Sequence, residues 1–435
     1  MEQVADFFRD SLVQGVFAAV GALGVLAAIL LFPVQWLRRR RREPTATKPE
    51  QQRFAVPVTG AERGAVIVAQ PGSTVNVYLD GLPQAKAQVR DPFEEGRRLQ
   101  EAGQHEAAIA EFEKAFAAAD TDSQRCALHG LIANSLFDLG RLREAEGHYR
   151  QALAAAEKAE DSEAQAAALG NLGIVYRERG QLDAARDRHR AALALHEHMG
   201  NRAGEARQLG NLGNVYLERG DLDKAEEHYS RVLQILKDVP DPVTEAKAVG
   251  NLGLVYADRG DLDKAEDHHK KALAIDAQTG NKLGQAEDLG NLGLVYFYRR
   301  QPGDLDKAED HHKKALAIDV EIGNKLGEAR DLGNLGLVYA CKGDLDKAEE
   351  HLKKALDMLH QMDNRTGQAQ VVSNLALLHA QKGNAAGALP YLREARRIFA
   401  ELGASPDVEK IDGLIQELES PSPPKPKPKR GPKKP

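Results

Sequence analysis

The sequence predicts an all-α protein, a right-handed solenoid of about eight antiparallel helix pairs. The first observation is repetition: near-copies of the stretch Leu289–Tyr296 begin at residues 169, 209, 249, 289, 332 and 372, with spacings of 40, 40, 40, 43 and 40 residues. The second is that small and large residues recur at helical spacing on both sides of a glycine turn such as Gly260. One helical unit is therefore stacked many times.

Each unit carries the same small residues. An alanine begins the apolar pattern of every second helix, and eight such alanines predict eight repeats over residues 91–402: Ala108, Ala145, Ala185, Ala225, Ala265, Ala308, Ala348 and Ala388. The first helix pairs a glycine with a tyrosine: Gly173 with Tyr176, Gly213 with Tyr216, Gly253 with Tyr256, Gly293 with Tyr296, and Gly336 with Tyr339. Small residues let neighbouring backbones approach, and larger side chains fill the gaps in the next pair.

On these residues the chain resembles the tetratricopeptide repeat (TPR) family. The long period and the asparagine in the Leu-Gly-Asn-Leu stretch are similar to the long-helix variety found in kinesin light chains and spindle-orientation adaptors. The resemblance implies that the first helix of each repeat lines a concave groove, and that an aromatic knob on the second helix packs between its alanines. It is specific for the fold and says almost nothing about function.

Composition limits the partners. The net charge of −6 combines +5 from Arg38–Arg42, +6 from the last eleven residues and about −17 from the rest of the chain. An acidic array makes nucleic acid an unlikely partner of the solenoid. The two cysteines, Cys126 and Cys341, lie in different repeats and give neither a disulfide framework nor a metal-ligand cluster, which suits a reducing compartment.

A membrane anchor is predicted near the N-terminus. Residues 12–32 contain one strongly polar residue, Gln14, and are long enough for one bilayer crossing, within a transmembrane helix at residues 11–37. The five arginines that follow mark the cytoplasmic side, so residues 1–10 lie outside the cell membrane and the array lies in the cytoplasm. A cleaved signal peptide is the rival interpretation, but its basic residues should precede the apolar core.

The segments flanking the array have distinct predictions. Residues 38–64 form a basic juxtamembrane segment and linker, and residues 65–80 contain two β-branched runs around a Pro-Gly turn, which predict a short β-hairpin. Asp91-Pro92 opens the first repeat, residues 405–419 form a helix that caps the array, and residues 420–435 are a disordered Pro/Lys tail. The tail's charges suit anionic lipid or nucleic acid, and solubility explains them equally well.

No catalytic or cofactor site is expected. The sequence has no phosphate loop, zinc-protease helix or nucleophile elbow, which indicates a protein that is not an enzyme and binds no cofactor. His189, His269 and His312 fall at the knob position that Phe112, Tyr149 and Tyr229 fill elsewhere. We therefore expect these histidines to be packing residues, and we expect no metal site.

The candidate binding site is a ladder of asparagines, one per repeat at the same position of the first helix: Asn171, Asn211, Asn251, Asn291, Asn334 and Asn374. The resemblance implies that matching asparagines contact the backbone of an extended peptide, for which an amide offers both donor and acceptor. The alternative is that these asparagines only tie neighbouring helices together. Residues near each asparagine that share its face complete the predicted peptide-binding set: Arg207, Asn214, Lys247, Leu254, Leu294 and Leu337. Gly210 departs from the family's carboxylate clamp, where a lysine is expected.

These patterns predict a single-pass membrane protein that presents a TPR scaffold to an unknown protein or peptide ligand. A structural alternative is a self-associating membrane assembly, a homo-oligomer, since small residues such as Gly15 and Ala19 recur four apart in the apolar span. A third alternative is that the tail brings anionic lipid or nucleic acid to the array.

Overall fold

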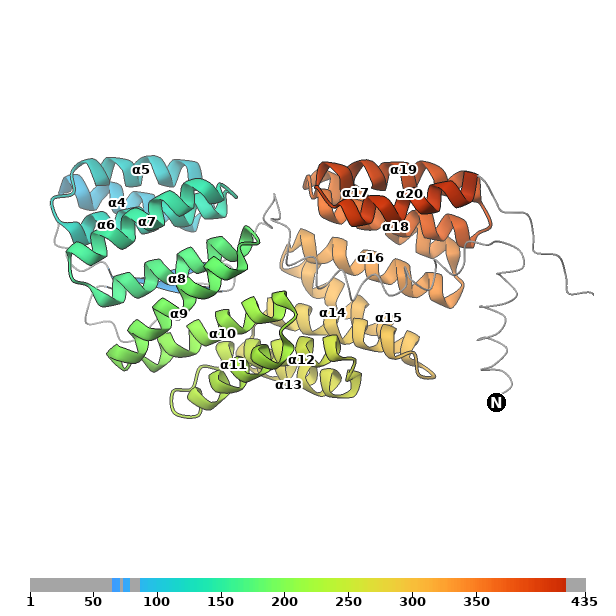
Figure 1. The fold of residues 1–435 in the computed structure, drawn as a ribbon, viewed down its shortest axis with the longest axis horizontal. Helices are drawn as coiled ribbons and strands as arrows, with labels where there is room; N and C mark the ends of the chain where they lie inside the picture. Colours follow the sequence, from blue (N-terminus) through green and yellow to red (C-terminus); the bar gives the residue numbers. More distant parts are fainter. Residues whose placement is uncertain (1–64, 71–72, 79–86, 420–435) are drawn as a thin grey trace, which may run out of the picture. The chain divides into compact units, whose positions relative to one another are not determined.

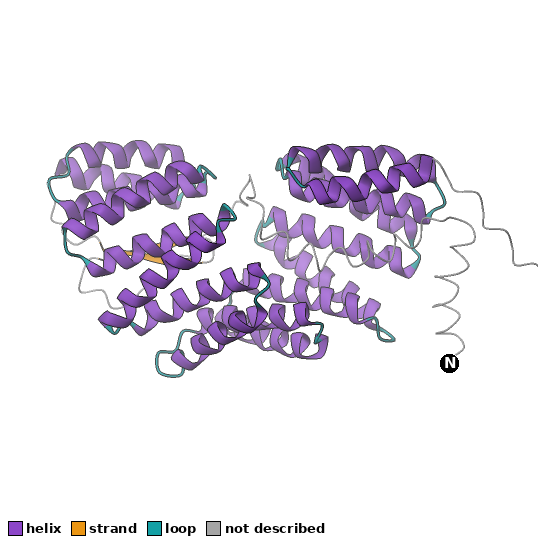
Figure 2. Cartoon of the chain, in the orientation of Figure 1, coloured by secondary structure: helices purple, strands orange, loops and turns teal. Residues whose placement is uncertain are grey.

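Helices fill most of the described chain, which comprises residues 65–70, 73–78 and 87–419 of the computed structural model. These residues divide into two compact units, 65–331 and 332–419, and each unit is treated by itself below. The described part contains 17 helices, α4 to α20, and one hairpin of two strands. Figures 1 and 2 show the helices stacked in consecutive pairs within each unit.

The predicted helix pairs are present, with two helices in each of eight repeats. The first unit holds α4 (Ala87–Glu101), α5 (His105–Ala117), α6 (Asp122–Asp138), α7 (Leu142–Lys158), α8 (Ser162–Glu178), α9 (Leu182–Met199), α10 (Arg202–Arg219), α11 (Leu222–Ile235), α12 (Pro242–Arg259), α13 (Leu262–Thr279), α14 (Lys282–Arg299) and α15 (Asp304–Glu321). Helix α16 (Lys325–Lys342) crosses the unit boundary. The second unit continues with α17 (Leu345–Gln361), α18 (Arg365–Gln381), α19 (Ala385–Glu401) and the closing helix α20 (Ser405–Glu419).

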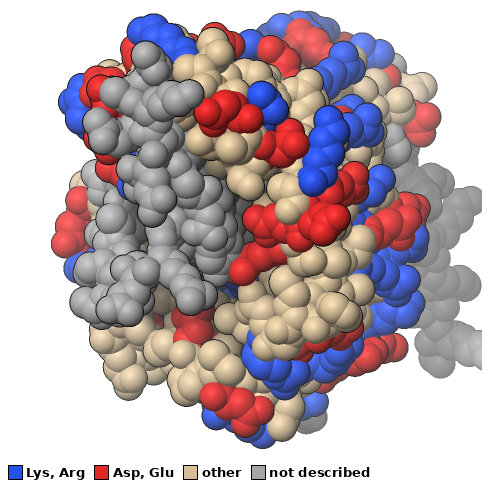
Figure 3. Space-filling model, turned by 90° about the vertical axis from the view of Figure 1, so that its left-hand side faces the viewer, with Lys and Arg blue, Asp and Glu red and all other residues tan. Residues whose placement is uncertain are grey.

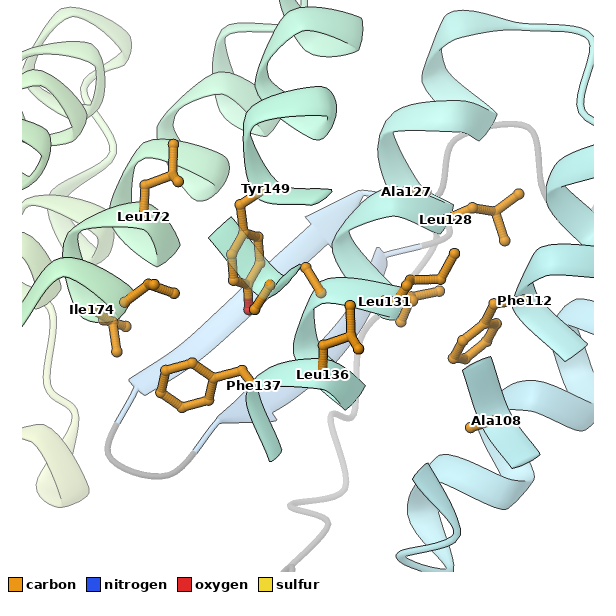
Figure 4. Packing of buried hydrophobic residues seen from close by; sticks show 14 of the residues in the cluster. Ala108, Phe112, Ala127, Leu128, Leu131, Leu136, Phe137, Tyr149, Leu172 and Ile174 are labelled. Carbon is orange, nitrogen blue, oxygen red and sulfur yellow. The ribbon is translucent and has the colours of Figure 1, made fainter. Parts of the chain in front are cut away.

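Small residues allow the close packing within each pair. All eight second-helix alanines are fully buried. The glycine of the first helix lies directly under the knob, because a Cβ built on Gly253 would lie 2.7 Å from His269 Nε2, and one on Gly213 would lie 2.5 Å from Tyr229 Cε1. No side chain fits there, so glycine is required by space and not by backbone conformation. Figure 4 shows buried hydrophobic side chains near the start of the array, among them Phe112, Leu131 and Tyr149.

Successive repeats are also tied together on the surface by tyrosine and arginine. The Tyr256 hydroxyl donates to Glu226 Oε1 at 2.6 Å, and Arg259 Nη2 lies 2.6 Å from Asp223 Oδ1, which links α12 to α11. Tyr296 and Arg299 repeat this arrangement on the acids of α13. The Tyr–Glu and Arg–Asp contacts therefore recur at successive junctions between repeats, because the sequence is periodic.

The hairpin packs on the first helices of repeats two and three. Strands β1 (Ala65–Gln70) and β2 (Ser73–Tyr78) pair antiparallel, from Ala65 opposite Tyr78 to Gln70 opposite Ser73. Strand β2 contacts α6 and α8, and β1 contacts α6. Figure 4 shows both strands beside the helices that carry Leu131 and Leu172. Because two strands alone are marginal in water, this packing accounts for the hairpin's stability.

One helix boundary differs from the sequence prediction, and the longer connection in repeat six is ordered. Helix α4 begins at Ala87, so Asp91-Pro92 lies inside the first helix and does not open it. The three extra residues of repeat six form an ordered turn, in which Asp304 accepts from the Gln301 backbone N–H at 2.9 Å and binds Arg299. This ion pair explains how the array absorbs the longer connection.

The predicted segments at the two ends lie outside the described residues. They are the N-terminus at 1–10, the transmembrane helix at 11–37, the linker at 38–64 and the tail at 420–435. A search of the described residues finds no helix with the length and apolar character of a membrane span. The anchor therefore stays a prediction.

Candidate functional site

Within each unit, the asparagine face is the surface formed by the ladder asparagines of that unit and by the residues four before, three after and seven after each of them. Its exposure changes along the first unit. Asn171 is 3% exposed and Asn211 is 8% exposed, whereas Asn251 and Asn291 are only half-buried. In repeat two the ladder position holds Leu131, which is fully buried.

The covered end of this face coincides with the hairpin. Leu131 lies on α6 and Asn171 lies on α8, the two helices that β2 contacts. The residue three after Asn171 is Ile174, which is buried, while the equivalent Leu254 and Leu294 are half-buried. The hairpin therefore lies against the end of the asparagine face that holds Leu131 and Asn171, and Asn211 on the next first helix, α10, is also buried.

Repeats four to six carry the open section, which we define as the six half-buried or exposed residues Arg207, Lys247, Asn251, Leu254, Asn291 and Leu294. They come from α10, α12 and α14. Two cations, two amides and two leucines lie on the same face, because residues three and four apart share one side of a helix. Such a surface can pair with a backbone, an acid and an aliphatic side chain together.

Asn214 has a structural role that the sequence did not reveal. Its Oδ1 accepts from the Tyr229 hydroxyl at 2.6 Å and from Asn251 Nδ2 at 3.1 Å. Asn214 therefore holds the knob of repeat four and ties repeat four to repeat five. Asn251 therefore links neighbouring helices, which is the alternative role that the sequence suggested for the ladder asparagines. Binding of a peptide by Asn251 stays a prediction.

The second unit contributes the remaining predicted residues. Asn334 and Leu337 on α16 are half-buried, and Asn374 on α18 is 8% exposed. Asn374 Oδ1 accepts a long hydrogen bond of 3.4 Å from Gln370 Nε2. Asn334 therefore resembles the half-buried Asn251 and Asn291 of the first unit, and Asn374 resembles the buried Asn171 and Asn211.

The histidine knobs are buried packing residues, as expected, and each has a polar partner in the next repeat. His189 Nδ1 lies 3.0 Å from Gln208 Oε1, His269 Nδ1 lies 2.9 Å from Asp288 Oδ1, and His312 Nδ1 lies 3.2 Å from Asp331 Oδ1. The partner always follows its histidine by 19 residues. At the same distance after Tyr149, Tyr229 and Leu352 the sequence has Ala168, Ala248 and Val371. This internal pairing was a signal in the sequence that could have found the three partners.

Burial controls the charge of the His269–Asp288 pair. Burial lowers the pKa of His269 to about 4 and raises the pKa of Asp288 to about 8, with Glu287 adding to the second shift. Burial also raises the pKa of Asp276, at the end of α13, to about 6, although Asn281 donates to it. Burial therefore holds His269 and Asp288 in their neutral forms near pH 7, which avoids burying an isolated charge.

The described residues contain no group of three or more histidine, cysteine, aspartate or glutamate side chains arranged to hold a metal ion. On the face shown in Figure 3, lysine and arginine side chains alternate with aspartate and glutamate side chains. Many ion pairs of the described residues lie within one helix, such as Lys313 with Glu309 on α15, and such pairs stabilise an exposed helix only slightly.

Comparison with known families identifies the repeat. Models of the tetratricopeptide repeat match residues 123–198, 244–303 and 297–361, residues 206–238, and residues 369–402. The chain is a tetratricopeptide repeat protein. A comparison with curated protein sequences gives no significant match.

Solved structures share this TPR architecture at low sequence identity. Aspartyl phosphate phosphatase F from Bacillus subtilis is 12% identical, with a TM-score of 0.53 over 72% of this chain and 94% of that one. A Rap protein complexed with competence and sporulation factor is 16% identical, with a TM-score of 0.51 over 76% and 97%. The apo form of RapI is 13% identical, with a TM-score of 0.53 over 63% of this chain and 98% of that one. At these identities the likeness concerns the fold alone.

Proposed function

We propose that this TPR protein is a non-catalytic, membrane-anchored adaptor whose open section binds an extended segment of a partner protein. The observation that carries the proposal is the difference in exposure along one ladder. Asn251 and Asn291 remain accessible beside Leu254 and Leu294, whereas Asn171 is buried beside the hairpin. A face with accessible amides, leucines and cations offers hydrogen bonds, apolar contact and charge to a single extended chain.

The anchor gives the scaffold its location. An apolar span at residues 12–32 followed by Arg38–Arg42 would hold the array on the cytoplasmic side of the cell membrane. Deleting residues 1–37 should move the protein from the membrane pellet to the supernatant, whereas the full chain should resist alkaline carbonate extraction. Carbonate release of the full chain would reject the anchor and leave the binding proposal standing.

Site-specific cross-linking in native membranes tests the binding face. A photoreactive residue at Leu294 should capture a discrete partner protein, and one at Lys270, an exposed position on α13, should not. Replacing Asn291 by alanine should reduce the capture from Leu294. Capture of a second copy of the chain, or equal capture from both positions, would favour the self-associating assembly.

A further inference from the structure

Charged side chains border the open section on both sides in repeats four and five. The basic row is Arg207 and Lys247, which lie four residues before the ladder asparagines. The acidic row is Glu218 and Asp258, which lie seven residues after them. Lys247 is exposed, Arg207 and Asp258 are half-buried, and Glu218 is 8% exposed, with its Oε1 3.6 Å from Arg177 Nε. The asparagine face therefore carries accessible charges of opposite sign on its two sides.

The two rows lie at different distances from the asparagines. With a rise of about 1.5 Å per residue, Lys247 lies about 6 Å along α12 from Asn251, and Asp258 lies about 10 Å from it in the other direction. Leu254 lies between Asn251 and Asp258 and is half-buried. A ligand held at Asn251 therefore needs only a short acidic side chain to meet Lys247. Its basic side chain needs a long aliphatic stem that covers Leu254, as lysine and arginine have.

An extended chain matches this arrangement. Its successive side chains point to opposite sides, and side chains two residues apart recur on one side about every 6.6 Å. Helix α12 contacts both α10 and α14, and packed helices lie about 8–10 Å apart. An acid at every second residue of a chain that crosses these helices thus comes close to each cation of the basic row. The backbone N–H and C=O groups point at right angles to the side chains and so face the ladder amides.

The charge pattern ends at repeat six. Glu287 occupies the position of the basic row in that repeat, and Tyr298 occupies the position of the acidic row. Glu287 is exposed and Tyr298 is half-buried. Selection by charge therefore concerns the part of a ligand that lies on α10 and α12.

We propose that the basic and acidic rows select the ligand of the open section, which is an extended segment in which acidic and basic residues alternate. This inference rests on the proposed function and specifies its ligand. The acids of the segment lie toward Lys247, and its lysines or arginines extend over Leu254 toward Asp258. A segment with a different charge order places a like charge beside at least one row, which discriminates against it. A second copy of the chain fits less well, because most described residues are helical and a helix bonds its backbone groups internally, away from Asn291.

Two synthetic peptides of equal composition test the selection. Both are fluorescently labelled, have blocked ends and contain equal numbers of aspartate and lysine. One alternates aspartate with lysine, and the other places the same residues in successive like-charged pairs, so only the first has all its acids on one side when extended. Because neither peptide carries a net charge, nonspecific attraction to the acidic array is equal for both. Fluorescence polarisation with the full-length detergent-solubilised protein at low salt measures the two affinities.

The alternating peptide should bind about ten-fold more tightly than the paired one. Lys247→Glu should weaken its binding about five- to ten-fold, because an attraction becomes a repulsion, and Asp258→Asn should weaken it about two- to five-fold. Lys271→Glu, at an exposed position on α13, makes the same change in net charge as Lys247→Glu and should leave the affinity within about two-fold. The melting temperatures of all three variants should match the wild type.

Equal affinity for the two peptides, no binding of either peptide, or equal effects of Lys247→Glu and Lys271→Glu would overturn the inference. Capture of a partner from Leu294 tests the proposed function separately. If that capture persists in Lys247→Glu while the peptides show no selection, the proposed function survives without this inference. If Leu294 captures nothing and neither peptide binds, both are rejected. Capture of a second copy that Lys247→Glu abolishes would show that another copy of the chain occupies the face and would also overturn the inference.

Discussion

The junctions that follow repeats four and five occupy equivalent places in the solenoid but are held together differently. In the first, the Tyr229 knob donates back to Asn214 on its own repeat and belongs to the same buried apolar cluster as Ala248 of the next repeat. In the second, the His269 knob bonds forward to Asp288 on the next repeat. The junction after repeat four is held by apolar packing and a hydroxyl–amide hydrogen bond, and the junction after repeat five is held by a buried polar pair.

This difference also shapes the binding face. A tyrosine knob needs an acceptor three residues after the ladder asparagine, and Asn214 supplies it. A histidine knob needs none there, so the equivalent positions hold Leu254 and Leu294. The choice of knob therefore decides whether the face presents an amide already in use or a half-buried leucine. Interior packing and surface chemistry are linked through one residue.

The largest effect should come from filling the space beneath a knob. Gly253→Ala would place a methyl group 2.7 Å from His269 Nε2 and should destabilise the protein by about 3 kcal/mol, since a rigid ring must move. Gly210→Ala is the matched control, because its Cβ meets nothing within 4 Å and alanine favours a helix by about 0.5–1 kcal/mol. Urea unfolding measures both. Equal effects would show that the knobs are loosely packed.

Breaking the polar pair should cost less. Asp288→Ala leaves His269 Nδ1 buried without its partner and opens a small cavity, which should destabilise the protein by about 2 kcal/mol. Adding His269→Tyr and Leu254→Asn rebuilds the arrangement of repeat four and should restore most of the loss. A triple variant less stable than Asp288→Ala would contradict the idea that the two junction types are interchangeable.

The polar junction should respond to pH. The raised pKa of Asp288 contributes stability that is complete below its ordinary value of 3.8 and is lost as pH rises through about 8. The lowered pKa of His269 contributes stability that is lost as pH falls from 6.5 through about 4. Between pH 6.5 and 8 the Asp288 effect dominates the pair, so raising the pH should lower its contribution to stability by about 1–2 kcal/mol. Urea midpoints of the wild type and Asp288→Asn measure this difference, and parallel pH profiles would refute it.

The smallest effect concerns the face itself. Asn291→Ala should weaken partner binding by about five- to ten-fold, the worth of one net hydrogen bond, and should leave the melting temperature unchanged. Asn171→Ala is the control at the same ladder position, and it should leave binding unchanged because Asn171 is buried. Titration of the purified variants with a linear peptide selected from a random library against the full-length protein compares their binding affinities. A loss at Asn171 that equals the loss at Asn291 would remove the distinction between covered and open sections.

Much of the architecture could be predicted from residues close together in the sequence. The period, the glycine–tyrosine pairs and the eight alanines gave the helix pairs, and the β-branched runs gave the hairpin strands. The start of α4 was predicted four residues late, because Pro92 was taken as a helix start although it lies inside the helix. Contact of the asparagine face with a ligand stays a prediction, and the two hydrogen bonds that Asn214 Oδ1 accepts were not foreseen, because they come from Tyr229 and Asn251 on other helices.

The sequence alone therefore determined the repeat, the helices and the residues that must be small, because these depend on short-range helical spacing and on a contact that recurs in every unit. Only the tertiary structure decided which ladder asparagines are accessible, and it showed which polar group each histidine knob meets, although the 19-residue spacing of those pairs was already present in the sequence. Both features depend on segments outside the repeat concerned: the hairpin beside α6 and α8, and the acids of the next repeat. Burial and hydrogen bonding between distant segments are set by how the units stack, and no single repeat contains that information.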